Sequence, residues 1–384
     1  MRVSGIGAQS FFNRIYCPVR PMKRTTSILW LLVMAFGLIP AWGQTPPSDL
    51  RDWELICFCS GRDKGPDEIV REDSNGQILF AARRGTTRQR LKEAHIEFTE
   101  SQIDLLVSWR LLAEQDGQLK TQMPILGPDE MTRLRALLHV EAVEIGASLL
   151  PDFNTLVSLL KQRGYGDEAY TIVFSYLLDN LVWDDFDQRH VLPSMEITAD
   201  RPFWSGALWA VYPRRGAPGT NTRSYGGWTL SVMWTQPVQP LLAPLYRSSL
   251  VEPFLADLEK LGSVSDPAIR SQMLALGIVA ADGKPWVPII REVDSDAVFA
   301  SSRAIAHKIS EGMLRAAQSP DLFALTGTSD HGVALIVAYH EFMWELLAHL
   351  EKTGVVLPPA ILSANTPDPR RVHDLVFIVV PQGK

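Results

Sequence analysis

Two stretches of this chain follow the same order of local patterns about 165 residues apart. In the first, an apolar-periodic helix leads to Asp116-Gly117, then to Pro124-Ile125-Leu126, and then to a long helical stretch. In the second, a similar helix leads to Asp282-Gly283, then to Pro288-Ile289-Ile290, and to another long helix. A turn easily absorbs the small change of offset between them. The pattern predicts an internal duplication; the alternative is that helix–turn–strand–helix order recurs by chance.

Each copy resembles, over about 50 residues, the end of a winged-helix domain, where a helix leads into a two-stranded wing. The resemblance rests on order and spacing. It implies DNA binding through a basic recognition helix. The candidate helices, 101–114 and 266–276, each contain a single basic residue, Arg110 and Arg270. We therefore expect the units to serve as a scaffold or a protein-contact surface.

The periodicity of apolar residues predicts the remaining elements. Residues 53–60 are expected to form a short strand, and so are residues 78–82. Thr99 followed by Gln102 predicts a capped helix that ends near Asp116-Gly117. Further helices are expected over 129–150, 151–163, 167–183 and 251–261, and a strand over 120–126.

The middle of the chain contains two aromatic-rich runs, 203–212 and 225–235. Their alternation, and the loop between them, predict two paired antiparallel strands, an aromatic β-hairpin. Tryptophan and arginine anchor many interfaces, and flat indoles also stack on sugars. The alternative is that one face of this hairpin is core. The predicted binding residues are Trp204, Trp209, Tyr212, Arg214, Arg215, Arg223, Tyr225, Trp228 and Trp234.

Residues 1–43 have the composition of a signal peptide. They contain five basic residues and no acidic one, and an unbroken apolar run, 28–39, follows Lys23-Arg24. That run is shorter than the ~20 residues of a membrane-spanning helix. Ala41 and Gly43 fit a signal-peptidase site, so we expect a secreted or periplasmic chain that begins at about Gln44. Residues 1–21 are then an upstream extension or a misplaced start, and an uncleaved anchor is the alternative.

The mature chain would be acidic. It would contain 32 Lys+Arg against 43 Asp+Glu, a formal net charge of −11. Phosphate backbones and anionic lipids repel such a chain unless a basic patch is segregated on its surface. We therefore expect no nucleic-acid partner and no stable membrane insertion after signal cleavage.

The mature chain would keep two cysteines, Cys57 and Cys59. Residues two apart on a strand share a face, but a disulfide between them would be strained. We expect both to be small, buried or half-buried strand residues. A redox or metal role, or a bond to a partner chain, is the alternative.

Short motifs of penicillin-recognising serine enzymes occur in the chain, but in the wrong order. They are Ser158-Leu159-Leu160-Lys161, Lys352-Thr353-Gly354 and Ser363-Ala364-Asn365. In that family Lys-Thr-Gly comes last and lies on a strand. Here it precedes Ser-Ala-Asn and is expected to close a helix, with Gly354 as the C-cap.

Other titratable residues also have structural explanations. Ser329 or Asp330 is expected to cap a helix, although His331 lies beside them. His340 and His349 are nine residues apart, whereas a metalloprotease helix needs two histidines four apart. Four aspartates form an acidic cluster that lacks the pattern of a calcium loop: Asp179, Asp184, Asp185 and Asp187. We expect this cluster to lie at a solvated helix end. No catalytic residue, metal site or cofactor is predicted.

The expected fold is α+β and predominantly helical, with two related winged-helix-like units separated by the aromatic β-hairpin. The expected organisation is a signal peptide (1–43), an N-terminal strand/loop segment (44–87), a first helical repeat unit (88–190), the hairpin with a Pro-rich connector (191–245), a second helical repeat unit (246–355) and a C-terminal strand and tail (356–384).

These observations favour an exported, soluble, non-catalytic binding or scaffolding protein of a bacterial envelope. Its expected partner is an envelope protein or a glycan. The alternative is an envelope hydrolase whose active site is assembled from residues far apart in the sequence.

Overall fold

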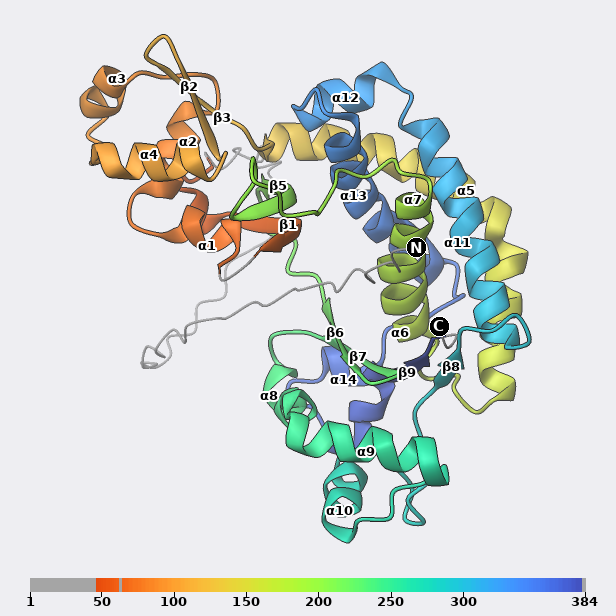
Figure 1. The fold of residues 1–384 in the computed structure, drawn as a ribbon. Coiled ribbons are helices and arrows are strands. Elements are labelled where there is room, and N and C mark those ends of the chain that lie inside the picture. Colours follow the sequence, from red (N-terminus) through yellow and green to blue (C-terminus); the bar gives the residue numbers. More distant parts are fainter. Residues whose placement is uncertain (1–45, 62–63, 382–384) are drawn as a thin grey trace, which may run out of the picture.

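The computed structural model describes residues 46–61 and 64–381 of the chain. The structure is mixed α+β, about 53% helical with small sheets, which confirms the predicted class. Figure 1 shows one group of short helices at one end of the molecule, a second group at the other end, and long helices beside both. The predicted signal peptide, residues 1–43, lies outside the described residues.

The first group, which we call the N-terminal module, joins strand β1 to short helices and a β-hairpin. Its elements are η1 (Leu50–Asp52), β1 (Glu54–Gly61), α1 (Pro66–Arg71), α2 (Asn75–Ala82), α3 (Arg88–Glu93), α4 (Glu100–Ser108), β2 (Leu112–Gln115) and β3 (Gln118–Thr121). Residues 78–82 lie in α2, so the strand predicted there is wrong. An apolar run this short does not distinguish a strand from a buried helix.

Helix α4 begins as predicted and ends earlier. Thr99 and Gln102 form the expected capping box, in which the Thr99 N–H donates to Gln102 Oε1 at 2.8 Å. The helix ends at Ser108, and Asp116 and Gly117 instead connect β2 to β3. Both turn residues have positive φ, 50° and 75°. The Asp-Gly pair therefore forms the two-residue loop that is typical of a tight β-hairpin.

The two aromatic runs belong to different sheets, so the predicted pairing between them is wrong. Strand β5 (Trp204–Val211) lies between β1 and β4 (Ile125–Leu126). The second sheet has the order β6-β7-β9-β8, and its strands are β6 (Gly219–Tyr225), β7 (Trp228–Trp234), β8 (Ile289–Arg291) and β9 (Val376–Val380). The hairpin partner of β7 is β6. Alternation shows that a segment is a strand, but it does not identify the neighbouring strand.

Long helices connect the two sheets. They are α5 (Pro128–Gln162), the continuous helix α6 (Ala169–Thr171), η2 (Ile172–Leu181) and α7 (Val182–Gln188), followed later by α11 (Ala297–Ala316), α12 (Pro320–Thr326) and α13 (His331–Lys352). We predicted a break in α5 at Pro151, but the helix continues through it. Helices α11 and α13 both pack along α5, and this packing outweighs the hydrogen bond lost at the proline.

The second group of short elements precedes and follows β8. It contains α8 (Gln239–Leu242), η3 (Ala243–Tyr246), α9 (Ser248–Leu261), α10 (Pro267–Ala275), α14 (Ala360–Ser363) and η4 (Pro369–Leu375). Two described helices, α5 and α13, are long and apolar enough to span a membrane, a test that core helices also pass. In α13, 72% of the apolar window is buried inside the protein.

Strand β5 separates two hydrophobic cores. Leu208 and Ala210 face the core of the N-terminal module, whereas Ala207, Trp209 and Val211 face the larger core around the long helices. The smaller core contains residues from Leu50 to Met123, on both sides of the boundary expected at position 88.

Cys57 and Cys59 are half-buried residues of β1, as predicted, but they also form a disulfide with each other, which was not predicted. Their Cα atoms are 5.4 Å apart, within the distance that a disulfide spans. In a fully extended strand, two residues in these positions would have Cα atoms about 6.6 Å apart.

Candidate functional site

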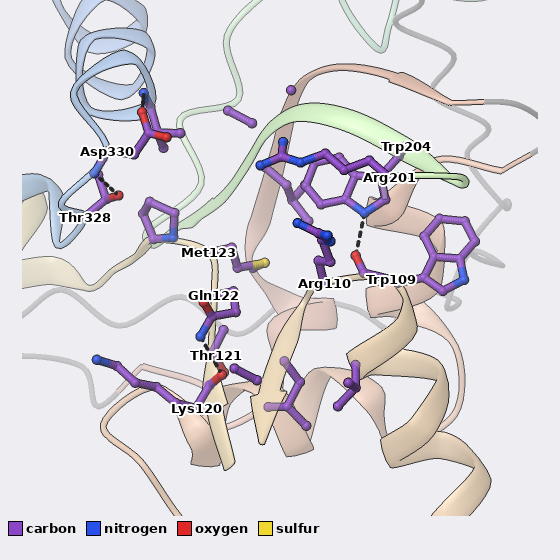
Figure 2. Close-up of a pocket in the computed structure, with 18 of the residues that line it drawn as sticks. Trp109, Arg110, Lys120, Thr121, Gln122, Met123, Arg201, Trp204, Thr328 and Asp330 are labelled. Atoms are coloured by element: carbon purple, nitrogen blue, oxygen red, sulfur yellow. Dashed lines mark hydrogen bonds between the residues drawn. The ribbon is translucent and has the colours of Figure 1, made fainter. Parts of the chain in front are cut away.

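A cleft of about 650 Å³ separates the N-terminal module from the first turn of α13 (Figure 2). One wall is formed by the end of α4 and by the β2–β3 hairpin, another by β5 and the residues before it. The loop that precedes α13 closes the cleft. The structure thus brings together three segments that are distant in the sequence.

Aromatic side chains form one wall of this cleft. Trp109, at the end of α4, stacks on Phe203 with ring centroids 5.1 Å apart and an interplanar angle of 5°. The indole Nε1 of Trp204 donates to the carbonyl of Trp109 at 2.6 Å, a hydrogen bond that Figure 2 shows. Phe203 remains 40% exposed. These contacts fix the entrance to β5 against α4.

Three cations line the cleft: Arg110, Lys120 and Arg201. All three are exposed, and none of their side chains has a hydrogen-bond or ion-pair partner among the residues that the structure describes. The acidic residues nearby are already engaged, because Arg88 pairs with Glu114 and Asp330 caps α13. The cleft is therefore a local positive region on a chain with an excess of acidic residues.

The floor of the cleft is an edge of β5. Strand β4 covers only the end of that edge, where Pro124 O and Leu126 O accept hydrogen bonds from Ala210 N and Tyr212 N. Successive residues of a strand direct their backbone groups to opposite sides. Gly206 and Leu208 therefore direct theirs to the same edge, beyond the end of β4. Within the described residues, no neighbouring strand pairs with this part of the edge.

The predicted binding residues do not form one surface. Trp209, Trp228 and Trp234 are 1%, 6% and 6% exposed and belong to the larger core. Tyr212 packs on Trp53, with ring centroids 5.5 Å apart. Tyr225 is half-buried beside the larger core.

The predicted arginines also lie apart. Arg214 donates to the backbone carbonyls of Arg51 and Asp52, and Arg223 donates to that of Tyr246. Only Trp204 of the predicted set lines the cleft. The sequence did not single out Lys120 and Arg201, which line the cleft, because neither belongs to an aromatic run.

Arg215 and Trp234 line a second, smaller cavity of about 70 Å³, together with Asp179, His340 and Trp344. Beside it, Arg215 Nη2 and Arg135 Nε donate to Glu341 Oε2 at 2.6 and 2.8 Å. Glu341 is 1% exposed. Burial alone would raise its pKa, but His340, Arg215 and Arg135 hold the pKa of this carboxyl well below its usual range.

The acidic cluster predicted at a solvated helix end is partly buried instead. Asp179 is on η2, a π-helical segment. Burial raises the pKa of Asp179 to about 6, although His340 opposes the shift. Burial and the neighbouring Glu292 raise the pKa of Asp184 to about 7. The prediction failed because the helix continues past Trp183 to Gln188.

Two other predictions from the sequence are confirmed. Asp330 caps α13, with its Oδ1 accepting from Val333 N at 3.0 Å. Gly354 follows the end of α13 with a φ of 73°, the left-handed conformation expected at a helix C-terminus.

Comparison with protein-family models, with curated proteins and with solved structures finds no significant match to this chain. The functional argument therefore rests on the cleft, the cavity and their chemistry.

Proposed function

We propose that the chain contains two related winged-helix-like units. After α4, Leu111 N donates to Leu106 O, and after α10, Ile278 N donates to Met273 O, 167 residues later. Arg110 and Gly277 precede these donors, and both have positive φ. An Asp-Gly turn follows in each unit, which supports the duplication inferred from the sequence.

The strands that follow also correspond. Pro124 O accepts from Ala210 N, and Pro288 O accepts from Ile378 N. Strand β4 is parallel to β5, and β8 is parallel to β9. A long helix, α5 or α11, follows in each case. These matched pairings support two copies of one unit joined through the long helices.

We further propose that the protein is an exported, non-catalytic binding protein of a bacterial envelope, and that it captures an extended, acidic polypeptide segment in the cleft. One observation carries this proposal: unpaired cations line the cleft, and no described strand pairs with the part of the β5 edge that forms its floor. A peptide strand could add to that edge through its backbone. Acidic side chains of the peptide would then neutralise Arg110, Lys120 and Arg201.

Two further features support export. The disulfide between Cys57 and Cys59 is of a kind that persists in oxidising compartments such as the periplasm. The basic, acid-free segment at the start of the chain has the composition of a signal peptide.

The binding proposal is tested with a fluorescent peptide of about ten residues that alternates Glu and Val. We expect Arg110→Glu and Arg201→Glu each to weaken binding at least about tenfold, because each reverses a charge in the cleft. Raising NaCl from about 50 to about 500 mM should weaken binding by the wild-type protein. The readout is fluorescence anisotropy.

The matched control is Arg90→Glu on α3, an exposed arginine of the same module that does not line the cleft. Equal binding by all variants, or no binding at millimolar peptide, would contradict the proposal. Binding of an oligosaccharide instead, lost in Phe203→Ala, would identify the cleft as a glycan site.

The alternative function is an envelope hydrolase, and the smaller cavity is what favours it. Asp179 lines that cavity beside His340, and a carboxyl with a pKa of about 6 is suited to exchanging protons near neutral pH. Hydrolysis of envelope substrates that is lost in Asp179→Asn, with folding retained, would support this alternative over a binding protein.

A further inference from the structure

Three potential metal ligands meet where the start of α6 packs against η4. Glu168 directly precedes α6, and His373 and Asp374 lie on η4, more than 200 residues later. Their ligand atoms all lie within 4.8 Å of one another. Glu168 is 3% exposed and Asp374 is fully buried, so both carboxyl groups are shielded from bulk water.

The orientation of the His373 ring leaves one nitrogen facing a carboxylate. Nδ1 lies 2.9 Å from the carbonyl oxygen of Arg370, so it carries a proton and donates. Nε2 lies 3.1 Å from Asp374 Oδ1. In a neutral ring, Nε2 would then direct a lone pair at a carboxylate oxygen. This arrangement requires either a second proton on the ring or a cation that both atoms bind.

Glu168 supplies the second observation. Its Oε2 is buried, and no donor among the described residues forms a hydrogen bond with it. A buried carboxylate oxygen without a partner is costly unless a proton or a cation neutralises it. Asp374 Oδ2, in contrast, accepts from Arg371 Nε at 2.7 Å. Asp374 Oδ1, the oxygen that lies beside His373 Nε2, forms no hydrogen bond with a described residue.

The surrounding residues hold the imidazole in place. Trp286 stacks on His373, with ring centroids 5.6 Å apart and planes 3° apart. Gly277 approaches so closely that a Cβ there would lie 2.6 Å from His373 Nδ1. The hydrogen bond from Nδ1 to a backbone carbonyl is typical of metal-binding histidines, because it orients the ring and leaves Nε2 for the metal.

We propose that Glu168, His373 Nε2 and Asp374 Oδ1 bind a divalent first-row transition-metal ion. With metal–ligand bonds of about 2.1 Å, neighbouring ligands of an octahedral ion lie about 3 Å apart. The separation of 3.1 Å between His373 Nε2 and Asp374 Oδ1 matches this geometry. Imidazole with carboxylates suits Zn²⁺ or Mn²⁺ better than Ca²⁺, which prefers oxygen ligands. The ion would join α6 to η4 and thus to β9.

The test uses the full chain, stripped with a chelator and dialysed against Zn²⁺ or Mn²⁺. We expect elemental analysis to find about one ion per chain, and the Tm to rise by about 3–6 °C. The electron paramagnetic resonance spectrum of the Mn²⁺ form should show an ordered ion coupled to nitrogen. Glu168→Gln and His373→Gln should each abolish stoichiometric binding.

The matched control is His139→Gln, because His139 Nδ1 also lies 3.1 Å from a carboxylate, Glu345 Oε2, but without a third ligand. This variant should bind metal like the wild type. Wild-type protein without stoichiometric metal after dialysis, or metal retained in both ligand variants, overturns the proposal. The wild-type stoichiometry and spectrum decide the question even if a ligand variant does not fold.

Discussion

Glu341 places a negative charge in the core between α5, α13 and the loop before β6. Its neighbours there are the guanidinium groups of Arg135 and Arg215. The strong depression of its pKa shows that these cations stabilise the ionised form. At the residue scale, this carboxylate joins three segments that no local sequence pattern relates.

We predict that Glu341→Gln lowers the free energy of unfolding by about 3–5 kcal/mol, because it removes a buried charge and leaves two half-buried cations without their carboxylate. Chemical denaturation measures the change. Glu345→Gln on the same helix is the control, since Glu345 lies 3.6 Å from Arg215 and is 18% exposed. A similar small loss in both variants would mean that Glu341 contributes no more than a surface charge.

At the scale of elements, the sequence predicts local conformation better than pairing. The capping box at Thr99 and the cap at Asp330 are found as predicted, because each involves residues three apart. The predicted aromatic hairpin is wrong, because β5 pairs with β1 and β4, whereas β7 pairs with β6 and with the distant β9. The alternation of residues along one strand does not specify which other strand will pair with it.

Strand β5 requires a glycine at position 206, where it pairs with Cys59 of β1. Gly206 has a φ of 113°, and a Cβ there would lie 2.8 Å from Cys59 Cα and collide with Phe58 O. We predict that Gly206→Ala lowers the free energy of unfolding by about 2–4 kcal/mol, through backbone strain and overpacking.

Thermal and chemical denaturation measure this effect. Gly227→Ala, in the turn between β6 and β7, is the control, because no atom lies within 4 Å of its added Cβ. If Gly206→Ala were as stable as this control, β1 and β5 would not approach each other as closely at Gly206 as the structure shows.

At the scale of the whole molecule, two partly buried acids make stability depend on pH. The pKa values of Asp179 and Asp184 are raised to about 6 and about 7. An unfolded aspartate has a pKa near 3.9, so between about pH 4 and 7 the folded state binds more protons. Stability therefore falls as pH rises through this window.

We predict that the free energy of unfolding is higher at pH 5 than at pH 8 by on the order of 1–3 kcal/mol. The measurement is denaturation in the presence of a chelator, so that bound metal does not contribute. Replacing both aspartates by asparagine should reduce the difference. A stability that rises between pH 5 and 8 would show that these carboxyls are solvated.

The sequence by itself determined what depends on near neighbours: the mixed, mainly helical class, the helix caps and the closing Gly354. Each follows from hydrogen bonds or φ preferences within a few residues. Tertiary structure alone decided which strands pair, where the three cations meet, and that Glu168 reaches His373. These contacts join residues up to about 200 positions apart. They form because burial of apolar surface brings whole elements together, and that force is non-directional, so no local pattern specifies them in advance.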